Sequence, residues 1–365
     1  MHKKKVGAAI TTDPRHIHYF TGYSTPWARS PSLLILRNAS DILFLGESRA
    51  NDARRVFDGE IQTFEDYALT KRMIAYGDFV AQELSAVLKE RKLLKGCKAI
   101  GIDDWYFPQA YSKAVLRVDP KARLVGVSDL ILAMRKTKGK DELANLREAT
   151  KRLELAYKVA KESIAIGKTE IELCRDVMSD SILRHGPFEF SRGDTWLSGE
   201  RTLEVGGPPS RRRFRVGDSV VLDLQAVANG YWADGARTYV LGKPNASQEA
   251  IFDVILNAKG RAEQLLRPGT VCKNVYKAVF EVLDKAGYSK LFPHHAGHGL
   301  GLEDQEGPFF IPGSKEKLEE NVVCTIEPGI YDSKIGGFRD EDTYIITKNG
   351  FEKITTSPRR LEYVG

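Results

Sequence analysis

Residues 219–241 read SVVLDLQAVANGYWADGARTYVL, two apolar, β-branched stretches joined at Asn229-Gly230. An Asn-Gly dipeptide between such stretches is typical of a hairpin with a two-residue type I′ turn. This turn would place Asp223 opposite Ala236, with Asp234 on the same face and diagonal to Asp223. Diagonal neighbours lie roughly 7–8 Å apart at the backbone, so the two carboxylates can hold one cation between them.

The aspartate pair alone leaves two interpretations open. A charged aspartate on an apolar strand needs a partner, because an unpaired buried charge is very costly. Arginine or backbone donors could supply that partner as well as a metal ion. The geometry also depends on the turn, since a three-residue loop would place the two side chains on opposite faces.

A histidine-rich segment supplies the third candidate. His298 lies in the run His294-His295-Ala296-Gly297-His298-Gly299, which holds three of the seven histidines of the chain. A lone histidine is more often a structural residue than a ligand, but this one stands in a cluster. The flanking glycines permit unusual backbone angles and a close approach to a bound group.

Two glutamates complete the set. Glu327 ends the apolar stretch 321–327 and is followed by Pro328-Gly329, while Glu341 lies in a strand, 338–346, entered through Gly336-Gly337. By alternation Glu341 shares its face with Arg339, and the neighbouring Asp340 and Asp342 point the other way. By itself this acidic stretch is also compatible with a solvated loop edge.

Together these residues predict a metal centre. Four carboxylates can neutralise and bridge two divalent ions, and a neutral imidazole can complete the coordination of one of them. An oxygen-rich set favours manganese, with cobalt, iron or zinc as alternatives. The predicted ligands are Asp223, Asp234, His298, Glu327 and Glu341.

The same segments resemble a known family, the Xaa-Pro dipeptidases (prolidases), aminopeptidase P, methionine aminopeptidase and creatinase. The ligands have the family's order, with spacings of 11, 64, 29 and 14 residues. The resemblance covers the C-terminal two-thirds and, more weakly, the N-terminal run 15–23. It implies an α+β protein with a C-terminal pita-bread (creatinase/aminopeptidase) fold and a smaller N-terminal α/β creatinase-like domain. It also implies a homodimer.

The resemblance further implies a metal-dependent hydrolase that cleaves Xaa-Pro dipeptides, or short peptides N-terminal to proline, through a metal-bridged hydroxide. By this analogy Asp234 and Glu341 bridge the two ions, while Asp223 and His298 complete one site each. Glu327 binds one ion and helps to transfer a proton to the leaving nitrogen, and Arg339 orients the carboxylates.

The chain departs from the family at two places. A histidine expected seven residues after His298 is replaced by Gln305, and residues 198–209 lack an expected Pro-His pair. Gln305 can donate a hydrogen bond but cannot shuttle a proton, and His294 or His295 could take over that role. These departures favour an alternative, a creatinase-like C–N hydrolase or lyase with a small non-peptide substrate. Aromatic candidates for the pocket walls are Trp196, Tyr231, Phe309 and Phe310.

Alternating strands and helices indicate an N-terminal domain over 1–135 and a catalytic domain over 136–365, with the polar run 135–140 as linker. The pattern predicts a long amphipathic helix from Asp141 to Ile166. Further helices are predicted over 73–93, 247–267 and 270–287.

Composition limits the remaining functions. The chain of 365 residues is 42% apolar, and no apolar stretch approaches the roughly 18 residues of a membrane span. The four cysteines lack zinc-like spacing and predict free thiols in the cytoplasm.

The net charge of +6 and the run 211–215 (RRRFR) invite a polyanion-binding hypothesis, but no nucleic-acid motif is present. A solvated loop is the preferred interpretation of the run, followed by an arginine that reaches the pocket and holds a substrate carboxylate. A non-catalytic binding protein is disfavoured by retention of all five ligands, so the expected partner is a small peptide or amide, without nucleic acid or membrane.

Overall fold

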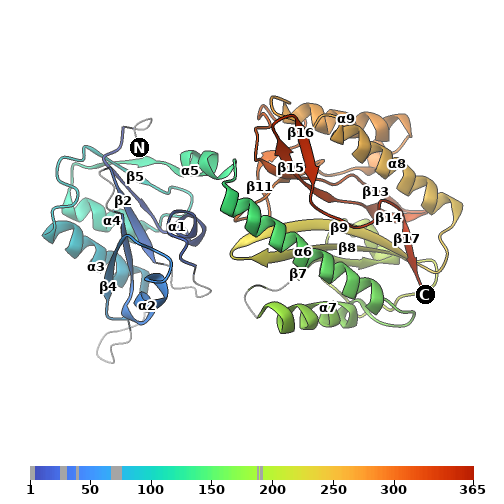
Figure 1. Cartoon of the computed structure of the whole chain (residues 1–365), viewed down its shortest axis with the longest axis horizontal. Coiled ribbons are helices and arrows are strands. Elements are labelled where there is room, and N and C mark those ends of the chain that lie inside the picture. Colours follow the sequence, from blue (N-terminus) through green and yellow to red (C-terminus); the bar gives the residue numbers. More distant parts are fainter. Residues whose placement is uncertain (1–4, 25–30, 38–40, 67–75, 187–188, 190–191) are drawn as a thin grey trace. The chain divides into compact units, whose positions relative to one another are not determined.

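The computed structural model describes residues 5–24, 31–37, 41–66, 76–186, 189 and 192–365. The chain forms two compact units, Met1–Arg135 and Lys136–Gly365. Figure 1 shows the first in blue to cyan and the second in green to red.

The first unit is a six-stranded sheet, in the order β4-β3-β2-β1-β5-β6, with helices on both faces. Leu34 and Phe44 belong to the core cluster with α3 and α4, whereas Leu33 and Leu43 pack with Ile17 of α1. This alternation shows that neighbouring residues of each strand serve opposite faces. The elements are β1 (Ala8–Thr11), α1 (Pro14–Thr21), β2 (Ser32–Leu36), β3 (Ile42–Gly46), η1 (Glu47–Arg49), α2 (Ala50–Ala53), β4 (Glu60–Phe64), α3 (Tyr76–Glu90), β5 (Ala99–Ile102), α4 (Gln109–Val118), β6 (Arg123–Gly126) and α5 (Ser128–Arg135).

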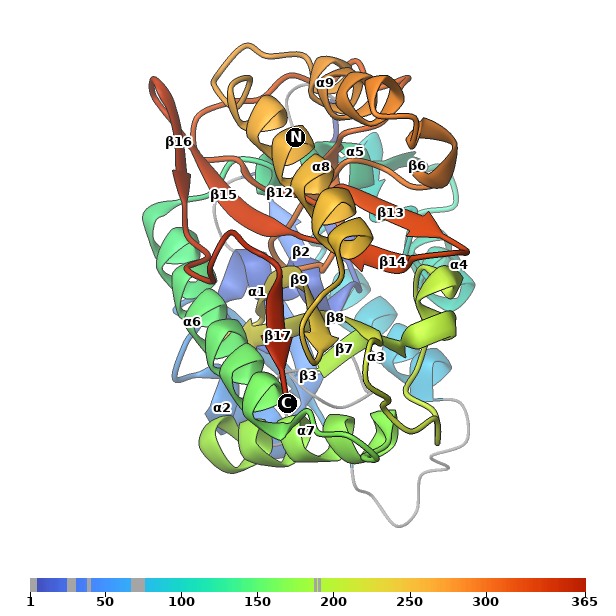
Figure 2. The same ribbon diagram turned by 90° about the vertical axis from the view of Figure 1, so that its right-hand side faces the viewer.

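The second unit places its sheets between two pairs of helices (Figures 1 and 2). Its sheets have the orders β17-β9-β8-β7, β11-β10-β12-β15-β16 and β13-β14. Helices α6 and α7 pack on the first sheet through Leu153 and Leu173, and helices α8 and α9 pack on the others through Ile255 and Val279. The candidate ligands all come from the strands between these helices or from residues next to them.

The three helices predicted in this unit correspond to α6, α8 and α9, which begin and end close to the predicted positions. The elements of the second unit are α6 (Lys140–Ser163), α7 (Glu170–His185), β7 (Arg192–Ser198), η2 (Gly199–Glu204), β8 (Ser219–Ala228), β9 (Tyr231–Leu241), α8 (Ala246–Glu263), α9 (Cys272–Lys285), η3 (Ser289–Leu291), β10 (His298–Gly299), β11 (Glu306–Phe309), β12 (Val323–Ile326), β13 (Gly329–Asp332), β14 (Gly336–Arg339), β15 (Asp342–Thr347), β16 (Gly350–Lys353) and β17 (Glu362–Val364). Of the helix predicted over 73–93, residues 73–75 lie outside the described part.

The polar run after Arg135 is more ordered than a solvated linker. Lys138 is buried and its ammonium lies 2.7 Å from Glu306 Oε1, while Thr137 forms a β-bridge with Val322. Lys138 therefore links the residues just before α6 to β11 within the second unit, because a buried lysine requires a carboxylate partner.

Candidate metal centre

The β8–β9 hairpin carries the first two candidate ligands. Asp223 lies opposite Ala236, which confirms the register predicted from the turn. The turn has φ values of 49° at Asn229 and 80° at Gly230, as a type I′ turn requires. Asp223 and Asp234 are both buried, so their carboxylates share one face of the hairpin inside the protein.

His298, at the start of β10, directs Nε2 toward three of the candidate carboxylates. Its Nδ1 lies 2.9 Å from the carbonyl oxygen of Gly299 and must donate to it, because a carbonyl only accepts. Nε2 therefore keeps its lone pair and lies 3.5 Å from Glu327, 3.6 Å from Asp234 and 4.0 Å from Glu341. Burial lowers the pKa of His298, which keeps the ring neutral and able to bind a metal ion.

The glycines beside His298 are needed for close contact between main chains. A Cβ atom on Gly297 would lie 2.1 Å from the carbonyl oxygen of Thr325, and one on Gly299 would lie 2.3 Å from that of Gly307. Gly297 also has a φ of 147°, which side chains rarely permit. The close approach predicted at these glycines is thus an approach to the main chain of Thr325 and Gly307.

Glu327 and Glu341 are held in place by main-chain hydrogen bonds to other ligand-bearing segments. The Glu327 amide donates to the carbonyl oxygen of Ala296 at 3.0 Å, and the Glu341 amide donates to that of Ala236 at 3.0 Å. Within the described part of the chain, Glu341 Oε1 is buried and has no hydrogen-bond partner, whereas Glu327 Oε1 lies 3.2 Å from His295 Nδ1. A buried carboxylate oxygen in this state needs a further ligand.

The pKa values of the candidate carboxylates also indicate that a further ligand is needed. Burial, followed by repulsion from the neighbouring carboxylates, raises the pKa values of Asp234 and Glu341 well above their usual range. Burial also raises the pKa of Asp223 to about 7, although Arg339 opposes the change. At Glu327 burial acts in the same direction, but nearby histidines outweigh it and lower the pKa to about 2.

The residues present fit a divalent cation. One ligand atom each from Asp234, His298 and Glu341 lie within 4.8 Å of one another, and all three residues are buried. Carboxylate oxygens and a neutral imidazole suit such an ion, which would also relieve the repulsion between the acids. Asp223 and Glu327 adjoin this group and can complete the coordination.

Arg339 lies against the first aspartate. Its Nη1 atom is 2.5 Å from Asp223 Oδ2, its Nε donates to the Tyr331 hydroxyl at 2.8 Å, and its Nη2 donates to the Val205 carbonyl. Val205 belongs to the segment that lacks the expected histidine. That segment thus contributes a main-chain oxygen that orients Arg339.

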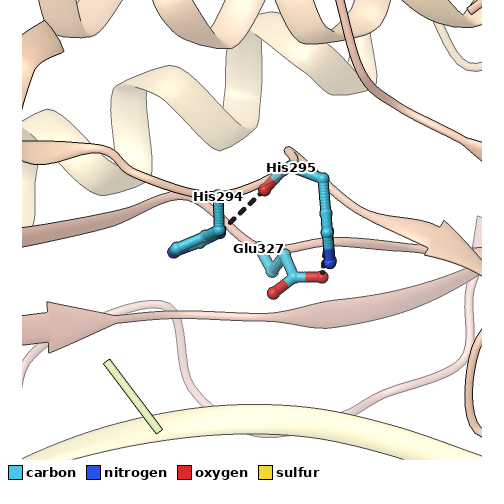
Figure 3. Close-up of side chains that lie close together, drawn as sticks. All are labelled: His294, His295 and Glu327. Atoms are coloured by element: carbon cyan, nitrogen blue, oxygen red, sulfur yellow. Dashed lines mark hydrogen bonds and ion pairs between the residues drawn. The ribbon is translucent and has the colours of Figure 1, made fainter. Parts of the chain in front are cut away.

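Two histidines, His294 and His295, lie beside Glu327 (Figure 3). His295 Nδ1 lies 3.2 Å from Glu327 Oε1, and His294 Nδ1 donates to the His295 carbonyl at 2.8 Å. His294 Nε2 then accepts from the Tyr331 hydroxyl at 2.9 Å, which links it to Arg339. Burial lowers the pKa of His294 to about 4. Tyr331 was not predicted as a site residue, although it follows Glu327-Pro328-Gly329 closely in the sequence.

The predicted substrate residues are less well placed. Gln305 is exposed at the end of the loop before β11. Trp196 and Phe310 are buried in hydrophobic clusters, and the Tyr231 hydroxyl donates to Glu142 at 3.1 Å. Their role as pocket walls stays a prediction, and Phe309 is only partly buried.

Asp340 and Asp342 point away from the ligand cluster, but they do not form a solvated edge. They are 2% and 1% exposed. The Lys259 ammonium contacts both, and Arg237 Nη2 lies 2.9 Å from Asp342. Two buried cations thus stand behind Glu341.

The arginine run is also structural where it is buried. Arg212 Nη1 lies 2.6 Å from Asp218, its Nη2 lies 2.7 Å from Glu200, and Arg213 donates to the Gly167 carbonyl at 2.7 Å. The run ties the α6–α7 connection to β8, so the solvated-loop interpretation is wrong for Arg212.

Comparisons with known proteins agree with this geometry. Residues 144–348 match "Metallopeptidase family M24", and residues 1–137 match "Creatinase/Prolidase N-terminal domain". A Xaa-Pro dipeptidase from Pyrococcus horikoshii is 35% identical over 271 residues, which are 74% of this chain and 76% of that protein. The solved prolidase from the same organism superposes with a TM-score of 0.86 at 30% identity and covers 99% of this chain and 97% of that chain. An X-Pro aminopeptidase from Thermotoga maritima shares the fold, with a TM-score of 0.87 at 24% identity over 100% and 99% of the two chains. The predicted pita-bread fold with a creatinase-like N-terminal domain is confirmed.

Two further features concern the cysteines and the helices. All four cysteines are free thiols. Among the described residues, none of the helices has both the length and the apolar character that crossing a bilayer requires.

Proposed function

We propose, from the premise that this chain belongs to metallopeptidase family M24, that it hydrolyses Xaa-Pro dipeptides or short peptides at the bond before proline. The chain is a hydrolytic enzyme of that family, and its relatives include a Xaa-Pro dipeptidase and a prolidase. The observation that carries the proposal is the buried cluster in which neutral His298 faces the carboxylates of Glu327 and Asp234 and the unpartnered Oε1 of Glu341.

In this proposal five residues hold two divalent ions. Asp234, His298 and Glu341 would hold them together with Asp223 and Glu327, which adjoin this group. When bound, such ions lower the pKa of a water molecule and polarise the carbonyl group that is attacked. Manganese suits this oxygen-rich set best, with cobalt, iron or zinc as alternatives.

The remaining residues orient groups and handle the proton. Glu327, next to His295, accepts the proton released by the attacking water and passes it to the leaving nitrogen. Arg339 fixes Asp223, and the path from Arg339 through Tyr331 places the neutral His294 beside the reaction site. Gln305, which is exposed, can contribute only a hydrogen bond.

The bond before proline sets a particular demand. It is a tertiary amide without N–H, so recognition must depend on the ring and on the charged ends of the dipeptide. The names of the relatives point to this class of substrate.

A second candidate is a creatinase-like C–N hydrolase or lyase acting on a small molecule at the same centre. The specific observation in its favour is that glutamine stands at position 305 and that residues 198–209 contain no histidine. A site rebuilt there would accept a different leaving group.

We further assign catalysis to residues 136–365 and the creatinase-like domain to residues 1–135. The enzyme is proposed to act in the cytoplasm as a homodimer. Free thiols fit a reducing compartment. Light scattering during size-exclusion chromatography tests the dimer, and a monomer would refute it.

The decisive experiment uses metal-stripped protein reloaded with manganese or cobalt. The substrates are Ala-Pro, Leu-Pro, Gly-Pro, a Xaa-Pro-Xaa tripeptide and creatine. Cleavage of the dipeptides alone supports a prolidase, and cleavage of the tripeptide indicates an aminopeptidase. Two bound metals with every peptide left intact would instead favour the small-molecule alternative.

A pair of variants tests the role of the carboxylate. We expect Glu327→Ala to abolish turnover while the fold is retained, whereas Glu320→Gln, at an exposed position, retains wild-type turnover. Circular dichroism checks the fold of both variants. Wild-type activity in Glu327→Ala would exclude the proposed centre.

A further inference from the structure

A buried lysine stands behind the segment that carries Glu341. Helix α8 packs against β12, β13 and β14 (Figure 2). Its Lys259 is 1% exposed, and the ammonium lies 2.7 Å from Asp342 Oδ2 and also contacts Asp340 Oδ2. Lys259 thus joins the two residues that flank Glu341 in the sequence.

The segment needs such support because it lies between strands. Strand β14 ends at Arg339 and β15 begins at Asp342, so Asp340 and Glu341 lie outside the regular pairing of both. Two buried carboxylates this close together repel each other strongly unless a cation stands between them. Lys259 contacts both carboxylates directly, whereas Arg237 lies 2.9 Å from Asp342 but 3.9 Å from Asp340.

The opposite side of the segment is held from β9. Arg237 donates through Nη1 to the Glu341 carbonyl, and its Nη2 lies 2.9 Å from Asp342. The Glu341 amide donates to the Ala236 carbonyl at 3.0 Å. The main chain of Glu341 is therefore fixed on the hairpin side, which leaves Lys259 to fix it on the helix side.

We propose that Lys259 is a positioning residue of the metal centre: by holding Asp340 and Asp342 it fixes the main chain of Glu341 and so aims its carboxylate at the metal. This inference rests on the proposed function, in which Glu341 is a ligand. Partners that orient ligands typically account for about 10- to 100-fold in metal affinity.

The test compares Lys259→Met with Lys353→Met. Lys353 also lies 3.4 Å from Asp342, but its side chain is 24% exposed and it contacts the carboxylate from the outside. Manganese binding to metal-free protein is measured by titration calorimetry. We expect affinity to fall about 10- to 100-fold in Lys259→Met and to stay within about twofold of wild type in Lys353→Met. Saturating manganese should restore kcat with an unchanged KM for a Xaa-Pro dipeptide.

A purely structural role gives a different result. Lys259→Met would then lower the melting temperature of the metal-free protein, while the folded protein would bind manganese as wild type does, and the inference would be overturned. If Lys259→Met does not fold, Lys259→Gln decides in its place, since its shorter, neutral side chain keeps a polar end in the buried position but loses the cation that holds the two carboxylates; wild-type manganese affinity in that variant also overturns the inference. Failure of the wild-type protein to bind manganese would refute the proposed function itself, and this is measured first.

Discussion

Loading the metal-free protein with manganese at pH 7 is expected to release protons, because ligands must be deprotonated to bind. Burial and mutual repulsion raise the pKa values of Asp234 and Glu341 well above their usual range, so both carboxyls hold protons more readily than free carboxyls do. The pKa of Asp223 is raised to about 7, so this carboxyl holds roughly half a proton at pH 7. Glu327, with a pKa of about 2, and the neutral His298 release none.

The same shifts fix the sign of two pH dependences. Metal affinity rises with pH, since fewer protons remain to be displaced. The contribution of these three carboxyls to the stability of the metal-free protein falls as pH rises, because the folded state disfavours their ionised forms. For Asp223 this loss begins above its unfolded pKa of 3.8 and is complete above about 7. A shift of this size corresponds to roughly 4 kcal/mol.

Titration calorimetry in two buffers of different ionisation enthalpy measures the released protons. Glu341→Gln is the matched variant and should release fewer protons, since the amide cannot titrate. Melting of the metal-free wild type and of metal-free Glu341→Gln at pH 5 and pH 8 provides the second readout. The gain in melting temperature of the variant over wild type should be larger at pH 8, because burial disfavours the charged form of Glu341. Manganese binding without proton release, or a gain that shrinks at pH 8, would refute this account of the site.

Three further predictions concern single substitutions. Gly297→Ala should lower manganese affinity and cost roughly 2 kcal/mol or more of stability, because its Cβ would lie 2.1 Å from the Thr325 carbonyl oxygen; unchanged melting would contradict this. Gln305→His, at an exposed position, should leave the melting temperature unchanged and raise kcat/KM for Ala-Pro by roughly tenfold or more, and an unchanged rate would favour the small-molecule alternative. Lys138→Met should cost roughly 3–5 kcal/mol in denaturant unfolding, because it leaves Glu306 buried without its cation, and a loss below about 1 kcal/mol would show that Glu306 finds another partner.

What could be predicted from the sequence depended on local rules. The Asn229-Gly230 turn fixes the register of the hairpin over a few residues, so the relation of Asp223 to Asp234 followed from the sequence alone. The fold followed from the resemblance carried by the five ligand segments. Both inferences needed only short stretches or their order along the chain.

What could not be predicted depended on distant partners. The buried Asp340 and Asp342 pair with Lys259, which lies about eighty residues earlier on helix α8, and with Arg237 of β9. An aromatic residue such as Trp196 looks the same in sequence whether it lines a pocket or fills a core, and only the packing of helices on the sheet decides between them. Tyr331 acquires its role from Arg339, across the β13–β14 pair.

Charge compensation divides the ligand carboxylates into two kinds. Asp223 lies 2.5 Å from Arg339, and Glu327 lies 3.2 Å from His295, so protein groups compensate both. Among the described residues, the carboxylates of Asp234 and Glu341 have no arginine or lysine within ion-pair distance, and their pKa values rise furthest. If these two buried acids served packing alone, the protein would lose stability above pH 4, and no other interaction would offset that loss. The arrangement is favourable only when a cation lies between them, which agrees with the role of metal ligands that we propose for these two residues.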